Sequence, residues 1–162
     1  MRRAAAVLVA ALAVAGAAAA WALASLPLFS PPSQITEFGY VQSITPKGSG
    51  YLLRFDPALW LEGETANVAA AEDGVIRPGQ PVPNDYYIRN LDHKLLTYKL
   101  PANTHVTVLA SLGTTKISVA YLAKLLRTSN CGRFHVRANC RLGFWLRYQI
   151  DTVKALDQQY QP

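Results

Sequence analysis

The chain has 162 residues, of which 51% are hydrophobic, 10% aromatic and 16% charged, and its formal net charge is +6. This apolar content argues against intrinsic disorder, which is typical of chains with low hydrophobicity and high net charge, except at the edges of the domain such as the Pro-containing residues 30–33. Residues 25–162, which follow an apolar leader, have the length of one ordinary domain and can bury a core without a metal.

The N-terminal segment predicts export. Arg2 and Arg3 follow the first Met, and no further charged residue occurs before Glu37. A short basic segment before an apolar run, here residues 4–28, is typical of a secretory signal. The run is also long enough to cross a bilayer as an uncleaved anchor. In both cases the basic N-terminus predicts that the rest of the chain lies outside the cytoplasm.

Cleavage and retention of the leader are both left open. Ala22 and Ala24 stand at the third and first positions before a cleavage site at Ser25, which favours a signal peptide. A retained leader would instead contact the membrane through residues 4–28. We therefore expect a signal peptide or anchor over 1–24, a linker over 25–36 and a single extracytoplasmic β-rich domain over 37–162.

A β-hairpin is expected at the start of the domain. Aromatic and β-branched residues predict a strand over 38–44, and the Gly- and Pro-containing segment 45–50 predicts a turn. A second strand is expected over 51–56, ended by Pro57.

A short helix is expected next, over residues 64–73, because this stretch is rich in Ala and lacks strand-forming residues. Gly74 stands where a left-handed residue commonly ends a helix. Four residues share one helical face by their spacing and predict close packing there: Ala66, Ala69, Ala70 and Asp73. A loop over 77–85 follows, stiffened by three prolines.

The middle of the domain predicts three more strands. They are expected over 86–89, 95–100 and 105–109, with the first two paired across residues 90–94. Tyr86 and Tyr87 should point to opposite faces, one toward the core and one exposed. The segment 82–90 is either a rigid junction or a recognition edge for a ligand.

The C-terminal part predicts a helix and a final hairpin. Apolar residues at helical spacing predict a helix over 117–126, capped by Thr115 or Ser118. The hairpin is expected from strands over 144–150 and 153–157. The fold class is therefore α+β, mainly antiparallel β in a small barrel or sandwich, with two short helices and a preceding N-terminal apolar helix.

Charge is distributed unevenly along the domain. Residues 25–92 carry eight acidic and four basic side chains, whereas residues 93–150 carry nine basic and no acidic ones. The two halves can simply attract each other across one fold, with the basic surface solvated. Alternatively, the basic half forms a patch for an anionic partner: an envelope polymer, a lipid or an acidic protein.

Two cysteines enclose a basic loop. In an exported chain, Cys131 and Cys140 predict a disulfide, which contributes about 2–3 kcal/mol on the chain-entropy model. Together with His135 they can also supply three zinc ligands, but a fourth ligand is not evident, and we expect a disulfide without a metal. The candidate anion-binding residues of this loop and its flank are Arg127, Arg133, Arg137 and Arg141.

No motif arranges a catalytic site, so we assign no catalytic, cofactor-binding or metal-binding residue and expect no cofactor. Asp92 and His93 are neighbours in sequence, whereas a triad needs three groups that converge in space. Five further acids are numerous enough for a carboxylate pair or a calcium site, although no calcium-loop pattern is present: Glu62, Glu64, Glu72, Asp73 and Asp85.

Three blocks of residues carry a resemblance. They are Gly39-Tyr40-Val41 with Phe55-Asp56-Pro57-Ala58-Leu59-Trp60-Leu61, then Pro83-Asn84-Asp85-Tyr86-Tyr87-Ile88-Arg89-Asn90, and finally Gln158-Gln159-Tyr160-Gln161-Pro162. Through these blocks, most of residues 38–162 resembles a family of uncharacterised secreted or membrane-anchored bacterial proteins, of actinobacterial type. The resemblance implies an exported domain and supplies neither an activity nor site residues.

The expected function is binding. The sequence favours an exported non-enzymatic domain that binds an envelope component or partner, with an anionic ligand matched to the basic half. The extracytoplasmic address argues against nucleic acid as the partner. The alternative is a hydrolase or metal-dependent enzyme whose site is assembled from scattered acids and histidines.

Overall fold

The computed structural model describes residues 33–110, 113–127 and 143–161. All of them belong to one compact unit, Ser33–Pro162. None of the helices within these ranges is long and apolar enough to cross a bilayer. The leader, most of the linker, both cysteines and the expected N-terminal apolar helix lie outside the described residues.

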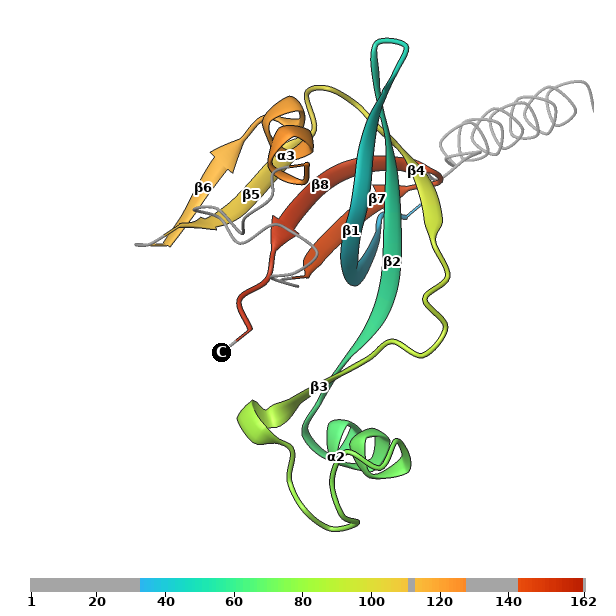
Figure 1. Ribbon diagram of the computed structural model, residues 1–162, viewed down its shortest axis with the longest axis vertical. Coiled ribbons are helices and arrows are strands. Elements are labelled where there is room, and N and C mark those ends of the chain that lie inside the picture. Colours follow the sequence, from blue (N-terminus) through green and yellow to red (C-terminus); the bar gives the residue numbers. More distant parts are fainter. Residues whose placement is uncertain (1–32, 111–112, 128–142, 162) are drawn as a thin grey trace, which may run out of the picture. The chain divides into compact units, whose positions relative to one another are not determined.

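Strands dominate the described residues, in which two α-helices and one 3₁₀ turn also occur (Figure 1). In chain order the elements are β1 (Ile35–Lys47), β2 (Gly50–Glu62), α2 (Gly63–Glu72), a 3₁₀ turn (Pro83–Asp85), β3 (Tyr86–Arg89), β4 (Leu96–Leu100), β5 (His105–Ala110), β6 (Gly113–Ile117), α3 (Val119–Leu125), β7 (Phe144–Gln149) and β8 (Thr152–Gln158).

Five of the strands close into a barrel in the order β1-β2-β4-β8-β7. Four of the five contacts are antiparallel, and the closing contact between β4 and β8 is parallel. That seam is narrow, because it consists of the single register pair Lys99↔Thr152. β3 extends the sheet beside β2, and β5 and β6 extend it beside β8. The expectation of a mainly antiparallel small barrel with two short helices is thus confirmed.

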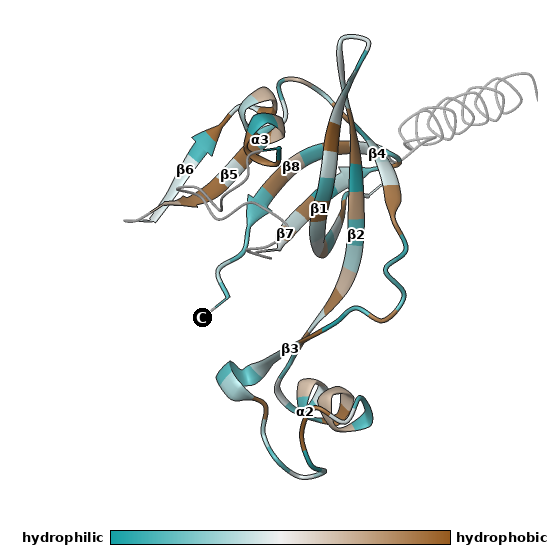
Figure 2. Ribbon diagram, in the orientation of Figure 1, coloured by the Kyte–Doolittle hydropathy of each residue, from teal (hydrophilic) through white to brown (hydrophobic). Residues whose placement is uncertain are grey.

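The barrel core follows from alternation of apolar and polar residues along the strands. Leu53 and Phe55 of β2 are fully buried, whereas Arg54 between them is exposed. Figure 2 shows the resulting bands of high and low hydropathy along β1 and β2. α3 adds Val119 and Leu122 to the same core. Its N-cap is Ser118, whose hydroxyl accepts a hydrogen bond from the Tyr121 N–H at 3.1 Å. Ser118 is one of the two residues that the sequence offered as the cap.

A smaller apolar cluster forms around α2, which lies with β3 at the far end of β2 from the β1–β2 turn (Figure 1). Ala66 and Ala70 are fully buried there, and Val82 packs against them. The expected alanine face is therefore confirmed. The helix ends at Glu72, and Gly74 adopts the expected left-handed backbone with φ of 72°.

Two expectations about strand ends and pairing are wrong. Pro57 does not end the second strand, because β2 continues to Glu62. The last pair between β2 and β4 is Phe55↔Leu96, so β4 no longer pairs with β2 at Pro57. A proline is tolerated there, because its missing N–H is not needed for a hydrogen bond to β4. β3 and β4 do not pair with each other, since β2 is long enough to pair with β4 along its first half and β3 along its second.

Two further details differ from expectation. The sequence interpretation missed β6, a short strand of small and polar residues that pairs with β5. Tyr86 and Tyr87 are both half-buried, rather than one buried and one exposed. Tyr86 stacks on Trp60, and Tyr87 packs against the α2 cluster, so each face of β3 has its own partner.

Candidate functional site

One end of the barrel carries a pocket of about 580 Å³, which we call the lysine pocket. Three separate segments line it: the β1–β2 turn with the start of β2, the end of β4 with the residues that follow, and the start of β8. Its members are Lys47, Ser49, Gly50, Tyr51, Leu52, Lys99, Leu100, Pro101, Ala102, Asn103 and Thr152. Apolar side chains thus form much of the wall, and the charged groups of the wall are both lysines.

Glycines in the β1–β2 turn shape this pocket. Gly48 adopts φ of 58°, a left-handed backbone that glycine accepts without steric cost. Gly50 packs closely on β4, because a Cβ built there would lie 3.0 Å from the carbonyl oxygen of Leu100. The turn therefore lies directly beside the end of β4, and Lys47 and Lys99 belong to one wall.

One of the two lysines of the pocket is paired with an acid. Lys99 Nζ lies 2.8 Å from the Asp151 carboxylate, and this ion pair lowers the pKa of Asp151 from its ordinary value. Both side chains are largely exposed, so solvent weakens the pair. Lys47 and Lys99 are therefore the basic groups of the described wall, and Asp151 is the acid paired with one of them.

A second pocket, of about 550 Å³, lies where β2 leaves the barrel, and we call it the aromatic pocket. The lining comprises Thr36, Glu37, Phe38, Pro57, Ala58, Leu59, Trp60, Arg89, Asn90, Leu91, Asp92 and Trp145. Phe38 is only 2% exposed, because its ring meets Trp60 and Trp145 edge-on at centroid distances of 5.0 and 5.2 Å. Trp60 also stacks on Tyr86 at 4.5 Å.

The aromatic cluster stands on the outside of the barrel. Phe144 and Leu146 point into the core, so Trp145 between them points outward. Trp145 is the register partner of Phe38, and Phe38 is in turn the partner of Ala58 on β2. These cross-strand neighbours place large rings side by side on a face that would otherwise be open to solvent.

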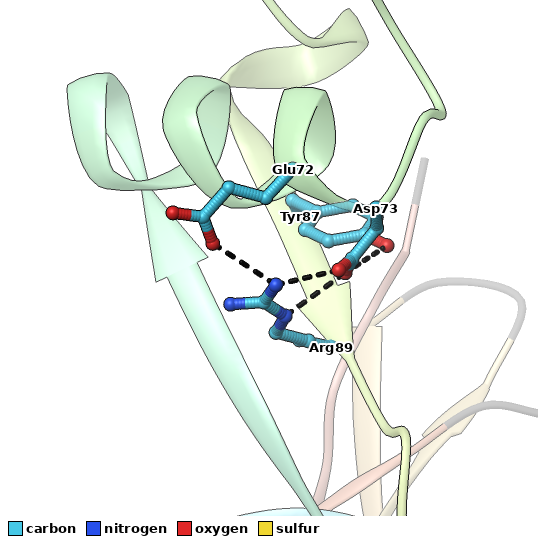
Figure 3. A network of polar contacts seen from close by, with 4 residues as sticks. All are labelled: Glu72, Asp73, Tyr87 and Arg89. Atoms are coloured by element: carbon cyan, nitrogen blue, oxygen red, sulfur yellow. Dashed lines mark hydrogen bonds and ion pairs between the residues drawn. The ribbon is translucent and has the colours of Figure 1, made fainter.

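A polar network attaches β3 to the end of α2 (Figure 3). Arg89 contacts both carboxylate oxygens of Asp73, at 2.9 and 2.5 Å, and the Glu72 carboxylate at 3.0 Å. The Tyr87 hydroxyl donates a hydrogen bond to Oδ2 of Asp73 at 3.0 Å. The hydrogen bond from Arg89 lowers the pKa of Asp73. Burial and the bond to Asp73 raise the pKa of Tyr87, and the bond to Asp73 raises that of Arg89.

A buried carboxylate lies near an exposed histidine. Asp56 is 5% exposed, and its Oδ2 lies 3.3 Å from His93 Nδ1. Its Oδ1 is buried with no hydrogen-bond partner among the described residues. A carboxylate and an imidazole alone do not make a triad, which also needs a nucleophile. Nor does any group of three His, Cys, Asp or Glu residues suit a metal within the described ranges.

The described residues that the sequence singled out lie at separate places in the structure and do not form one site. Arg127 is exposed just after α3. Glu72 and Asp73 converge on Arg89 in a structural network, and Asp92 lies at the aromatic pocket. The remaining residues predicted for the basic loop lie outside the described part of the chain: Cys131 and Cys140 with their expected disulfide, His135, Arg133, Arg137 and Arg141.

Sequence reasoning missed both pockets and the contact between Asp56 and His93. The lysine pocket joins three segments that are distant in sequence, and none of them has a distinctive pattern. For the aromatic pocket a signal existed, because Trp145 lies between two core residues of one strand and must therefore face outward. No family model, curated protein or solved structure matches the chain.

Proposed function

We propose that the chain is an exported, non-enzymatic domain that binds an anionic envelope component at the lysine pocket. The observation that carries the proposal is the placement of Lys47 and Lys99 in one concave, largely apolar wall. A pocket of this kind suits a ligand in which an anionic group is joined to an apolar part. Among the anionic partners open to an exported chain, a lipid-like molecule matches this wall best.

The connectivity of the barrel supports the same location by analogy. In five-stranded Greek-key barrels of the OB type, ligands bind on strands two and three and at the loops between strands one and two and strands four and five. In the barrel of this chain the corresponding parts are β2, β4, the β1–β2 turn and the β7–β8 turn. The analogy supports the location of the ligand site only. The kind of ligand is argued from the residues of the pocket.

The first test is calorimetric titration of the full-length chain with hexyl phosphate, with hexanol as the uncharged comparison. We expect hexyl phosphate to bind and its affinity to fall as salt is raised, because the lysines are exposed. Replacing Lys47 and Lys99 by Gln should weaken binding by about two- to fivefold per lysine. The matched control replaces Lys116 and Lys124, which are exposed on β6 and α3, and should leave affinity nearly unchanged.

A variant with the opposite expected sign sharpens the test. Asp151→Asn removes the carboxylate that pairs with Lys99 and leaves this lysine available for the ligand. We therefore expect tighter binding of hexyl phosphate by this variant. Equal affinities for hexyl phosphate and hexanol, or equal losses in the two double-lysine variants, would contradict the proposed site. Inorganic polyphosphate, titrated in the same way, distinguishes a polymer from a lipid source.

The exported address is tested separately. Cell fractionation should find the chain outside the cytoplasm, and the intact mass should show either cleavage before Ser25 or a retained leader. Alkylation without reduction should leave Cys131 and Cys140 unmodified if they form the proposed disulfide. Recovery of the chain from the cytoplasm with two free thiols would refute the proposed export. It would not bear on the lysine pocket, which the titrations test independently.

A further inference from the structure

We propose that the aromatic pocket is a second ligand site and that it takes a small organic ammonium compound. The proposal uses a different set of residues from the lysine pocket and does not depend on it. The volume of about 550 Å³ lies inside the range of roughly 300–1,000 Å³ that is typical of small-molecule sites.

The aromatic walls of the pocket are held in place before any ligand arrives. Trp60 donates its indole N–H to Glu62 at 2.8 Å, and Trp145 donates its indole N–H to Gln159 at 2.9 Å. Both indole donors are therefore already used, and both tryptophans belong to the lining of the pocket. Ring faces carry partial negative charge and attract cations, most strongly in tryptophan.

The carboxylate charge of the pocket comes from Asp92. Glu37 also belongs to the lining, but its Oε2 accepts a hydrogen bond from the Tyr98 hydroxyl at 2.9 Å. Tyr98 is buried in the barrel core, so this carboxylate lies on the opposite side of β1 from Phe38. Asp92 is exposed and has no hydrogen-bond or ion-pair partner within the described part of the chain. An ammonium group beside Asp92 would give this carboxylate an ionic partner, and the aromatic rings belong to the same lining.

The one cationic side chain of the described lining is already matched. Arg89 directs Nε and Nη2 to Asp73 and Glu72 (Figure 3), so two carboxylates outside the pocket balance its charge. The remaining charge of the lining is negative, which disfavours an anion.

The experiment is titration of the full-length chain with n-butylammonium, n-butanol and butyrate at equal ionic strength. Calorimetry gives the affinity, and tryptophan fluorescence reports the pocket, because two of the three tryptophans of the chain line it. We expect n-butylammonium to bind, n-butanol to bind more weakly and butyrate not to bind. Equal binding of n-butylammonium and n-butanol would overturn the proposal and leave an apolar pocket.

Variants test the two kinds of wall. Asp92→Asn should weaken n-butylammonium binding by about two- to fivefold, as expected for a partly exposed ion pair. Asp85→Asn, which removes an exposed acid outside the pocket, is the matched control and should bind as the parent does. Equal affinities of these two variants would refute the role of the carboxylate.

Trp145→Leu should weaken binding by about two- to thirtyfold, whereas Trp145→Phe should retain most of it. Equal loss in the Leu and Phe variants would refute the aromatic contribution. Asp92 lies on an exposed segment, so its variant tests the site even if Trp145→Leu does not fold.

Discussion

Gly39 is a residue of the barrel at which there is no space for a side chain. It lies opposite Pro57 in the ladder between β1 and β2. A Cβ added there would overlap the carbonyl oxygen of Asp56 and approach the Phe55 ring to 2.8 Å. Phe55 is fully buried in the barrel core, so its ring cannot move aside without disturbing neighbouring side chains. The glycine is thus required by packing, not by an unusual backbone angle.

We expect Gly39→Ala to lower the free energy of unfolding by about 1–3 kcal/mol, the usual cost of overpacking a core. Urea unfolding followed by circular dichroism measures this change. The control is Gly48→Asn, since Gly48 has open space around it and Asn tolerates a left-handed backbone. Equal destabilisation by the two substitutions would contradict the packing explanation.

At the scale of elements, the network around Arg89 determines how β3 meets α2. Glu72 and Asp73 come from the end of the helix, whereas Tyr87 and Arg89 come from the strand. At these residues the segment 82–90 is therefore attached to the end of α2 by hydrogen bonds and ion pairs. Arg89 also lines the aromatic pocket, so the same junction positions part of the proposed ammonium site.

The lowered pKa of Asp73 predicts a pH dependence of stability. A carboxyl whose pKa is lower in the folded protein stabilises it above its ordinary pKa of 3.8, and this contribution is lost as the pH falls through the folded value. We expect Asp73→Asn to lower the urea midpoint most near pH 6–7, and the difference from the parent to shrink on acidification. Asp85→Asn serves as the control, and a difference for Asp73→Asn that is constant from pH 7 to pH 3 would contradict the prediction.

Local elements were predictable from sequence where the signal is local. The first and last hairpins have turn residues between two strand-forming runs, and α2 has a run of alanines with a glycine after it. Pairing between distant strands was not predictable, because alternation shows which face is buried and does not name the partner strand. For that reason β3 and β4 were assigned to each other rather than to β2.

The candidate sites were less predictable than the fold. Sequence reasoning placed anion binding on arginines of the cysteine loop, whereas the lysine pocket depends on Lys47 and Lys99, which the pairing of β4 with β2 brings together. Individual lysines on exposed surfaces are common, and their spacing in sequence carries no information about a shared wall.

At the scale of the whole molecule, closure of the barrel is uneven. β7 and β8 share six register pairs, while β4 and β8 share one. We expect amides of β4 to lose protection in hydrogen exchange before those of β7 and β8, since local opening requires fewer hydrogen bonds to break at the seam. Peptide-level exchange measured by mass spectrometry checks this order, and equal protection of β4 and β7 would contradict it.

The pairing of β1 with β7 also has a consequence for biosynthesis. About 100 residues separate these two strands, so at 5–20 residues per second a ribosome needs roughly 5–20 s to complete the second after the first. Throughout that interval one edge of β1 lacks its partner strand β7, and the barrel cannot close. If the chain is exported as proposed, an open barrel during synthesis would suit passage through a translocation channel, which admits an unfolded chain.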